Sequence, residues 1–248
     1  MPEGLSHKSS AEFDGYAEGY EAGMENPLKR FVGRSADEFI EFKAHRLKSD
    51  LRRRPLQSSR PPDALEWLDF GCGTGVFLRM LKKCGFSGVF HGCDVSVGML
   101  AEASSAWTAG DAPEFGLIGA DGRLPYKDHS FDVVLASAVL HHVPRADRPG
   151  VYREIARVLR PGGRFYVFEH NPLNPITRWV VSHTAIDQNA ILLKPREVRA
   201  ALSNAGLVRL WTSSMMFFPP RWHWAWPIDE RMAWLPLGGQ YAVSGEQP

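Results

Sequence analysis

Residues 66–75 have the sequence EWLDFGCGTG. The apolar run at 65–70 predicts a strand, and the glycines at alternate positions after it predict a sharp turn. Residues 76–81 continue with the apolar spacing of a helix. A strand, a glycine turn and a helix N-terminus bring unpaired backbone N–H groups together. The stretch therefore predicts a ligand site at this bend.

Two features of the bend indicate which ligand it takes. A dinucleotide fingerprint has glycine at its first, third and sixth positions, and here the sixth position is Val76. Asp69 precedes the first glycine by two residues, where its carboxylate would repel a diphosphate and attract a cation or an amine. The pattern therefore disfavours a nicotinamide dinucleotide as the ligand, and with it an NAD-dependent oxidoreductase as the function.

The composition of the chain limits the kinds of partner and the cellular compartment that we expect. The chain has 248 residues and a formal net charge of +1, which gives no strong field for nucleic acid or an anionic membrane. The cysteines, Cys72, Cys84 and Cys93, form no Cys-x-x-Cys pair, so we expect a reduced, cytoplasmic protein without disulfides or structural zinc. The first ten residues lack an apolar signal region, and no apolar run is long enough to span a bilayer.

The first 60 residues differ in pattern from the rest of the chain. Phe13, Tyr16 and Tyr20 recur at the spacing of an amphipathic helix. Ser35 and Glu38 form the pattern of a capping box, which predicts a helix to about residue 53. We expect residues 1–60 to form a helical extension or lid, and residues 61–248 to form the main domain.

From residue 63, strand and helix patterns alternate. Strands are predicted at 65–70, 88–93, 115–118, 131–137, 164–169, 207–213 and 240–244, and helices at 75–83, 96–107, 148–159 and 194–206. This succession predicts an α/β fold, a parallel sheet with helices on both faces. Ligands of such sheets lie beyond the carboxyl ends of the strands, so strand ends are the candidate site residues.

Asp94 ends the second predicted strand, about 20 residues after the glycines, where a carboxylate typically takes the hydroxyls of a ribose. The alternative, a helix N-cap, is already filled by Ser96. Val95 and Met99 then either pack on an adenine face or fill the core. The third strand leads into Ala120, Asp121 and Gly122. Asp121 can accept from an adenine amino group, or it bonds its own turn. The backbone near Ser137, after strand four, would face a ligand bound at this edge of the sheet.

These residues together closely resemble class I S-adenosylmethionine-dependent methyltransferases. The shared motifs are LDFGCGTG at 68–75, Asp94, Ala120-Asp121, SFDVV at 130–134 and LRPGG at 159–163. The resemblance implies a Rossmann-like sheet of seven strands, the last of them antiparallel, with the helices of residues 1–60 added to it. It also implies that S-adenosylmethionine binds along Asp69, Gly71, Cys72 and Gly73, with Asp94 at the ribose and Asp121 and Gly122 at the adenine.

The expected reaction is methyl transfer to a small molecule, with a hydroxyl of a glycan or secondary-metabolite type as the preferred acceptor. A general base assists such an acceptor, and His142 and His170 are the candidates, with His141 third. A metal site is not expected, because the histidines lack tight ligand spacing. Alternatives are a small amine as acceptor, or a non-catalytic protein that binds S-adenosylmethionine.

Residues outside the motifs suggest how the site is covered. Tyr16 and Tyr20 either fold over the cofactor or pack on the sheet edge, and Asn171 opens a segment that could cover substrate. Lys43 either reaches the cofactor carboxylate or is solvated. The insertion near 214–238 is rich in Trp and Phe. It forms an aromatic wall, a homo-oligomer contact or a weak interfacial membrane contact, or its rings pack on the sheet edge.

Overall fold

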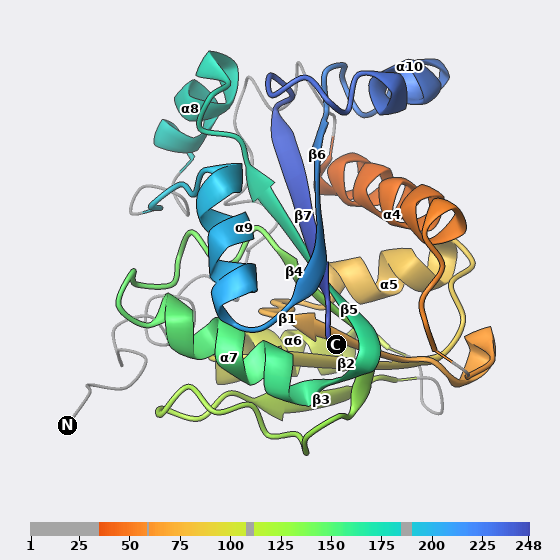
Figure 1. Ribbon diagram of the computed structural model, residues 1–248, viewed down its shortest axis with the longest axis vertical. Coiled ribbons are helices and arrows are strands. Elements are labelled where there is room, and N and C mark those ends of the chain that lie inside the picture. Colours follow the sequence, from red (N-terminus) through yellow and green to blue (C-terminus); the bar gives the residue numbers. More distant parts are fainter. Residues whose placement is uncertain (1–34, 59, 108–111, 185–189) are drawn as a thin grey trace.

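The computed structural model describes residues 35–58, 60–107, 112–184 and 190–248. Its centre is a sheet of seven strands in the order β3-β2-β1-β4-β5-β7-β6 (Figure 1). Neighbouring strands from β3 to β5 pair in parallel, whereas β7 pairs antiparallel with both β5 and β6. The expected α/β architecture with an antiparallel last strand is confirmed.

The strands are β1 (Glu66–Phe70), β2 (Val89–Asp94), β3 (Glu114–Leu117), β4 (Phe131–Ser137), β5 (Leu159–His170), β6 (Val208–Met215) and β7 (Gln240–Glu246). The helices are α4 (Ala36–Arg53), α5 (Val76–Lys83), α6 (Val97–Ser105), α7 (Arg148–Val158), α8 (Pro175–Ser182), α9 (Pro195–Asn204) and α10 (Trp226–Arg231), with 3-10 turns η1 (Pro62–Ala64) and η3 (His223–Ala225). Most bounds lie within two residues of those predicted from the sequence.

Two local predictions need correction. β5 starts at Leu159, because the chain pairs Phe131 with Leu159 and then bulges before Val133 pairs with Arg164. The glycines at 162–163 therefore come after the end of α7 but lie inside the next strand. Ser35 is the N-cap of α4, yet its side chain accepts no capping hydrogen bond, so the predicted capping box is not formed.

The sheet has a core on each face. On one face, α7 and α9 pack over the sheet through Val151, Ile155, Val198 and Leu202. The other face is covered by α4 and α5, which lie side by side in Figure 1. Because β-strand side chains alternate between faces, β5 sends Phe165 and Val167 to the first core and Tyr166 and Phe168 to the second.

Residues 1–34, which precede α4, are not among the described residues. The candidate lid residues Tyr16 and Tyr20 lie outside the described residues, so their roles stay predictions. In the part of the chain that the structure describes, no helix is both long and apolar enough to cross a membrane.

Candidate active site

The sheet order places β3, β2, β1 and β4 next to one another, with their carboxyl ends along one edge. The strand order reverses between β1 and β4, the place where ligands of such sheets bind. Asp69 lies near the end of β1, Asp94 ends β2, and Ser137 ends β4. The structure therefore brings the sequence-predicted cofactor residues from separate strands to one edge.

The glycine bend has a shape that only glycine supports easily. Gly71 has φ +69°, and a Cβ on it would lie 2.5 Å from Val139 Cγ1, so the segment after β4 packs directly against the bend. Gly73 has φ +51°, and a Cβ on it would meet no atom within 4 Å. The open space at Gly73 is room for a ligand against bare backbone.

Asp94 is bonded to this bend. Its Oδ2 accepts from the Gly73 N–H at 2.9 Å, and its Oδ1 accepts from the Ser96 N–H at 3.0 Å. Ser96 itself caps α6 by accepting from the Met99 N–H at 3.1 Å, as the sequence predicted. Asp94 therefore points toward the bend, which is the orientation that its predicted ribose contact requires.

Asp69 is a buried acid in an acidic surrounding. Burial and the charge of Asp94 raise the pKa of Asp69 to about 8, although Lys43 acts in the opposite direction. Lys43 comes from α4, is itself buried, and donates from Nζ to Ser137 Oγ at 2.9 Å. When Asp69 ionises, the two carboxylates outweigh the one lysine, and an ammonium or a sulfonium beside them would favour that ionised form. The residues present therefore fit S-adenosylmethionine, which carries both of these cations.

The residues predicted to contact adenine differ in their burial. Asp121 is exposed, and its Oδ1 accepts from the Arg123 N–H at 3.0 Å, so the carboxylate supports its own turn. Ala120 is exposed and Gly122 half-buried beside it. Met99 is buried, and Val95 packs against the core that α7 and α9 cover. Contacts of these residues with adenine stay predictions. In the bend itself, burial raises the pKa of the Cys72 thiol, which is not ionised at neutral pH.

Histidines gather where β4 and β5 end. His141 Nδ1 lies 2.6 Å from Glu169 Oε2, and Glu169 Oε1 accepts from the Leu140 N–H at 2.9 Å. The ring of His141 lies 4.1 Å from that of His142 and 5.4 Å from that of His170, between centroids. Burial alone would raise the pKa of Glu169, but the facing imidazoles outweigh it and lower that pKa.

Glu169 is a site residue that the sequence analysis missed. It is fully buried and belongs to β5, and the signal available was an acid beside a histidine at the end of an otherwise apolar strand. His141 is buried with it, whereas His142 and His170 are half-buried and closer to solvent. Within the described ranges, no group of three or more His, Cys, Asp or Glu side chains is arranged to hold a metal ion.

Asn171, proposed above as a substrate or lid residue, is fully buried and already engaged. Its Nδ2 donates to the carbonyls of Pro236 and Gly238, at 3.0 and 2.8 Å, and its Oδ1 accepts from the Leu173 N–H. This geometry favours a clamp between two loops. Contact of Asn171 with substrate stays a prediction that these bonds disfavour.

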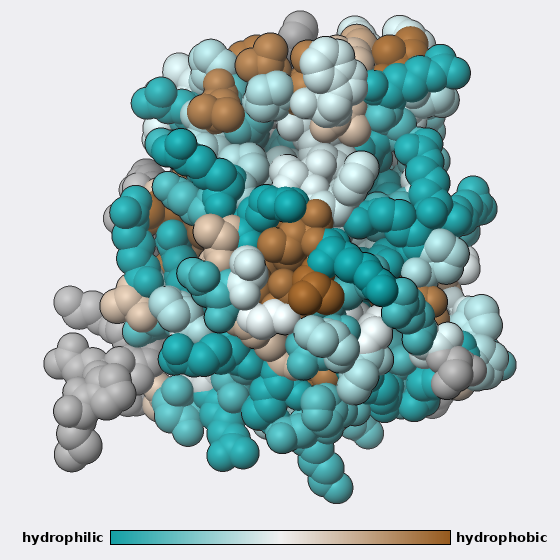
Figure 2. All heavy atoms as spheres, viewed as in Figure 1, coloured by the Kyte–Doolittle hydropathy of each residue, from teal (hydrophilic) through white to brown (hydrophobic). Residues whose placement is uncertain are grey.

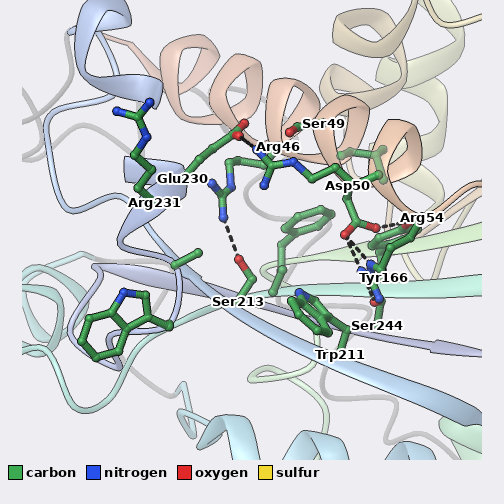
Figure 3. A pocket seen from close by; sticks show the side chains of 16 residues that line it. Arg46, Ser49, Asp50, Arg54, Tyr166, Trp211, Ser213, Glu230, Arg231 and Ser244 are labelled. Atoms are coloured by element: carbon green, nitrogen blue, oxygen red, sulfur yellow. Dashed lines mark hydrogen bonds and ion pairs between the residues drawn. The ribbon is translucent and has the colours of Figure 1, made fainter. Parts of the chain in front are cut away.

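A separate cavity of about 430 Å³ lies on the α4 side of the sheet, between α4 and strands β5, β7 and β6 (Figure 3). Asp50 anchors α4 there by accepting from the Tyr166 hydroxyl of β5 at 2.6 Å, and it also pairs with Arg54 at the end of its own helix. Arg46 donates to Ser213 Oγ at 2.6 Å across the same space. These bonds hold α4, and with it Lys43, against the sheet.

The comparisons with known proteins agree with this geometry. The sequence model of a family described as "Methyltransferase domain" matches residues 68–167. A ubiquinone biosynthesis O-methyltransferase from Rhizobium rhizogenes is 29% identical over 190 residues, 71% of this chain and 74% of that protein. A demethylmenaquinone methyltransferase from Mycobacterium tuberculosis is 36% identical over 170 residues, 68% of this chain and 66% of that protein.

Solved structures with the same fold include a SAM-dependent methyltransferase from Thermotoga maritima, with a TM-score of 0.66, 19% identity and coverage of 96% of this chain and 99% of that one. Magnesium protoporphyrin IX methyltransferase from Synechocystis, solved with bound S-adenosylhomocysteine, has a TM-score of 0.60 at 17% identity, covering 96% and 95%. The acidic glycine bend, the sheet order and these likenesses agree, and the chain belongs to the class I S-adenosylmethionine-dependent methyltransferases, with S-adenosylmethionine as its cofactor.

Proposed function

We propose that the protein transfers the methyl group to a hydroxyl of a small molecule. The observation that carries this proposal is the cluster of His141, His142 and His170 around the buried Glu169. A hydroxyl must lose a proton as it is methylated, and an imidazole of near-neutral pKa is the side chain best suited to take it. A preformed group of imidazoles at the cofactor edge therefore favours oxygen as the acceptor atom.

In this proposal each group of residues has its own task. When bound, S-adenosylmethionine supplies an electrophilic methyl group, so the protein mainly binds and orients. Asp69 and Asp94 hold the cofactor, with Lys43 fixing the wall beside Ser137. His142 or His170 accepts the proton of the acceptor hydroxyl, and the Glu169–His141 pair orients the rings from beneath. Positioning of two reactants is worth up to about 7–11 kcal/mol, and a base adds roughly 10²–10⁴-fold.

The relatives give limited support for the acceptor. The Rhizobium rhizogenes relative is named an O-methyltransferase of ubiquinone biosynthesis, which agrees with a hydroxyl acceptor. The name of the mycobacterial relative specifies demethylmenaquinone and no acceptor atom, and the chain spans 66% of its length. Residues 1–60 complete the proposal as a covering extension, which the docking of α4 beside the site supports.

Methyl transfer from labelled S-adenosylmethionine to three probes tests the acceptor. Catechol offers phenolic hydroxyls, methyl glucoside offers sugar hydroxyls, and 2-phenylethylamine offers only an amine. We expect methylation of a hydroxyl probe, reduced roughly 10²–10⁴-fold in His142→Gln or His170→Gln. His129→Gln is the control, because His129 is exposed and precedes the start of β4, whereas His142 follows the end of that strand. Methylation confined to the amine would show an N-methyltransferase instead.

A further inference from the structure

One end of the molecule exposes an unusual amount of apolar surface. Of the fourteen exposed large apolar side chains in the described ranges, eight belong to α8, η3, α10 and the loops beside them. These eight, here called the aromatic end face, are Leu173, Ile176, Trp179, Trp222, Trp224, Ile228, Trp234 and Leu237. Both α8 and α10 lie at the top of Figure 1, and Figure 2 shows apolar patches along the same end. Exposed apolar groups gathered in this way mark an interaction surface.

Polar contacts hold this face in place. Thr177 on α8 donates to the Gly239 carbonyl at 2.8 Å, and Asn174 donates to the Leu237 carbonyl at 2.8 Å. On the other side, Trp226 donates from its indole to the Pro220 carbonyl at 2.7 Å, and the buried Asp229 accepts from the Phe217 N–H at 2.7 Å. These bonds satisfy backbone groups of the loops, so the loops are fixed while the rings of the face stay outside.

The most exposed side chains of the face are not core residues. Trp234 is 79% exposed, Trp224 is 68% exposed and Ile176 is 60% exposed. Trp222 and Trp224 stack on each other with centroids 5.8 Å apart. The sequence alternative that these rings pack on the sheet edge is therefore wrong for Trp224 and Trp234.

The charges around the aromatic end face are mainly positive. Arg178 on α8, Arg221 before η3 and Arg231 at the end of α10 are all at least partly exposed. The described acids nearby are neutralised or hidden, since Glu230 pairs with Arg53 at 2.5 Å and Asp229 is buried. Tryptophan with arginine at one surface is the combination that binds the interface of an anionic bilayer.

The face also adjoins the proposed acceptor site. His170 ends β5, and the chain continues directly from it through Asn171 into Leu173 and α8. Asn171 in turn holds the loop that carries Leu237 by donating to Pro236 and Gly238. A surface pressed against this end would therefore lie near the carboxyl end of β5, where His170 is.

We propose that the aromatic end face docks on the interface of an anionic lipid bilayer, and that the acceptor is an amphiphile drawn from that bilayer. This inference rests on the proposed function, since it names the class of molecule whose hydroxyl is methylated. Docking is peripheral: the rings enter the headgroup region, and the arginines pair with lipid phosphates.

Co-sedimentation with vesicles tests the docking. Vesicles of phosphatidylcholine alone are compared with vesicles containing about 30% phosphatidylglycerol, an anionic lipid, and the double variant Trp224→Ser/Trp234→Ser is compared with Trp211→Ser. Trp211 is the matched control because it is 53% exposed but lies on β6, beside Arg54. We expect binding at least about tenfold tighter with phosphatidylglycerol and weakened by salt. We expect the double variant to lose at least about tenfold and Trp211→Ser to bind as the wild type does.

Three outcomes overturn the proposal. The first is no binding to either vesicle, and the second is equal binding by the double variant and the wild type. The third is a dimer in sedimentation velocity that the double variant converts to monomer without any vesicle binding, which would assign the face to a second copy of the chain. Transfer to water-soluble catechol without vesicles separates this result from the proposed function. If that transfer persists in the double variant, hydroxyl methylation stands even where docking fails. Docking without any hydroxyl transfer would leave the membrane contact standing, but it would overturn the proposed function and with it the amphiphilic acceptor.

Discussion

Lys43 Nζ lies 2.9 Å from Ser137 Oγ and joins the helix that precedes the sheet to the end of its central strand β4. Lys43 also lies close enough to Asp69 for its charge to act to lower the pKa of that carboxyl. A helix outside the shared motifs therefore contributes a buried cation to the cofactor edge. The sequence left open whether Lys43 is solvated or reaches the site, and the structure shows that it is buried there.

Lys43→Met should weaken cofactor binding. If Lys43 reaches the cofactor carboxylate, as one of the two sequence alternatives has it, the variant loses a charge-assisted hydrogen bond worth about 1.5–3 kcal/mol. We then expect the dissociation constant of S-adenosylhomocysteine to rise about tenfold or more. Isothermal titration calorimetry at neutral pH measures it. Lys83→Met is the control, since Lys83 is exposed at the end of α5. An unchanged constant in Lys43→Met would show that the lysine serves only the docking of α4.

Asp69→Asn should stabilise the cofactor-free protein while abolishing cofactor binding. The pKa of Asp69 is raised to about 8 in the folded state, chiefly by burial, against an ordinary value of about 3.9 in the unfolded state. Between these values the folded state binds more protons, so the free energy of unfolding falls as pH rises. The amide removes this loss, and its melting temperature should exceed that of the wild type most near the upper end of this range.

Differential scanning fluorimetry from about pH 5 to about pH 8, with and without S-adenosylhomocysteine, checks both halves of this prediction. Asp63→Asn serves as control, because Asp63 is exposed in η1. The wild type should also bind S-adenosylhomocysteine more tightly as pH rises across this range, because the ionised carboxylate attracts its ammonium. A variant less stable than the wild type at the alkaline end would contradict the assigned cost of burying this charge.

The glycines of the bend should fail in different ways. In Gly71→Ala, the new Cβ would lie 2.5 Å from Val139 Cγ1, so we expect destabilisation by overpacking of about 1–3 kcal/mol, in addition to the cost of the left-handed backbone at φ +69°. In Gly73→Ala the new Cβ meets no atom, and the cost is the left-handed backbone, about 1–2 kcal/mol. Urea unfolding measures the stability of each.

Cofactor binding separates these two variants further. Because the methyl group of Gly73→Ala would enter the open side of the bend, this variant should fold and yet bind S-adenosylhomocysteine poorly. Calorimetry on the folded variant checks it. If Gly73→Ala binds as the wild type does, the cofactor does not lie against that residue.

Glu169→Gln should lower the stability of the protein and weaken the proton transfer to the proposed histidine base. Removing one partner of a buried ion pair costs about 3–5 kcal/mol, and His141 would lose its carboxylate partner at Nδ1. Since the pKa of Glu169 is lowered, its stabilising contribution in the wild type should be present above the ordinary carboxyl pKa and be lost as pH falls through the lowered value.

The pH profile of methyl transfer distinguishes orientation from simple destabilisation. If Glu169 orients the histidines, the variant should lose activity and shift the pH dependence of kcat/KM at temperatures where it is fully folded. Tyr152→Phe is the control, because Tyr152 is a buried neighbour on α7 that makes no direct bond to the histidines among the described contacts. A variant that merely melts earlier, with an unshifted profile, would show that Glu169 is structural.

Local patterns in the chain were enough to predict the alternating strands and helices and a ligand site at the glycine bend, whereas S-adenosylmethionine and the antiparallel last strand followed from the resemblance to a known family. Alternating strand and helix periods depend on neighbours in the sequence, and the glycine bend with Asp69 and Asp94 lies on local strand ends, so residues 63–168 were readable without a structure. The contacts between distant segments needed the folded chain: Lys43 with Ser137, His141 with Glu169, and Asn171 with the loop at 236–238. These contacts arise because strand order, which no local pattern specifies, sets which strand ends are adjacent. Packing in three dimensions likewise determines that Trp224 and Trp234 stay outside the core.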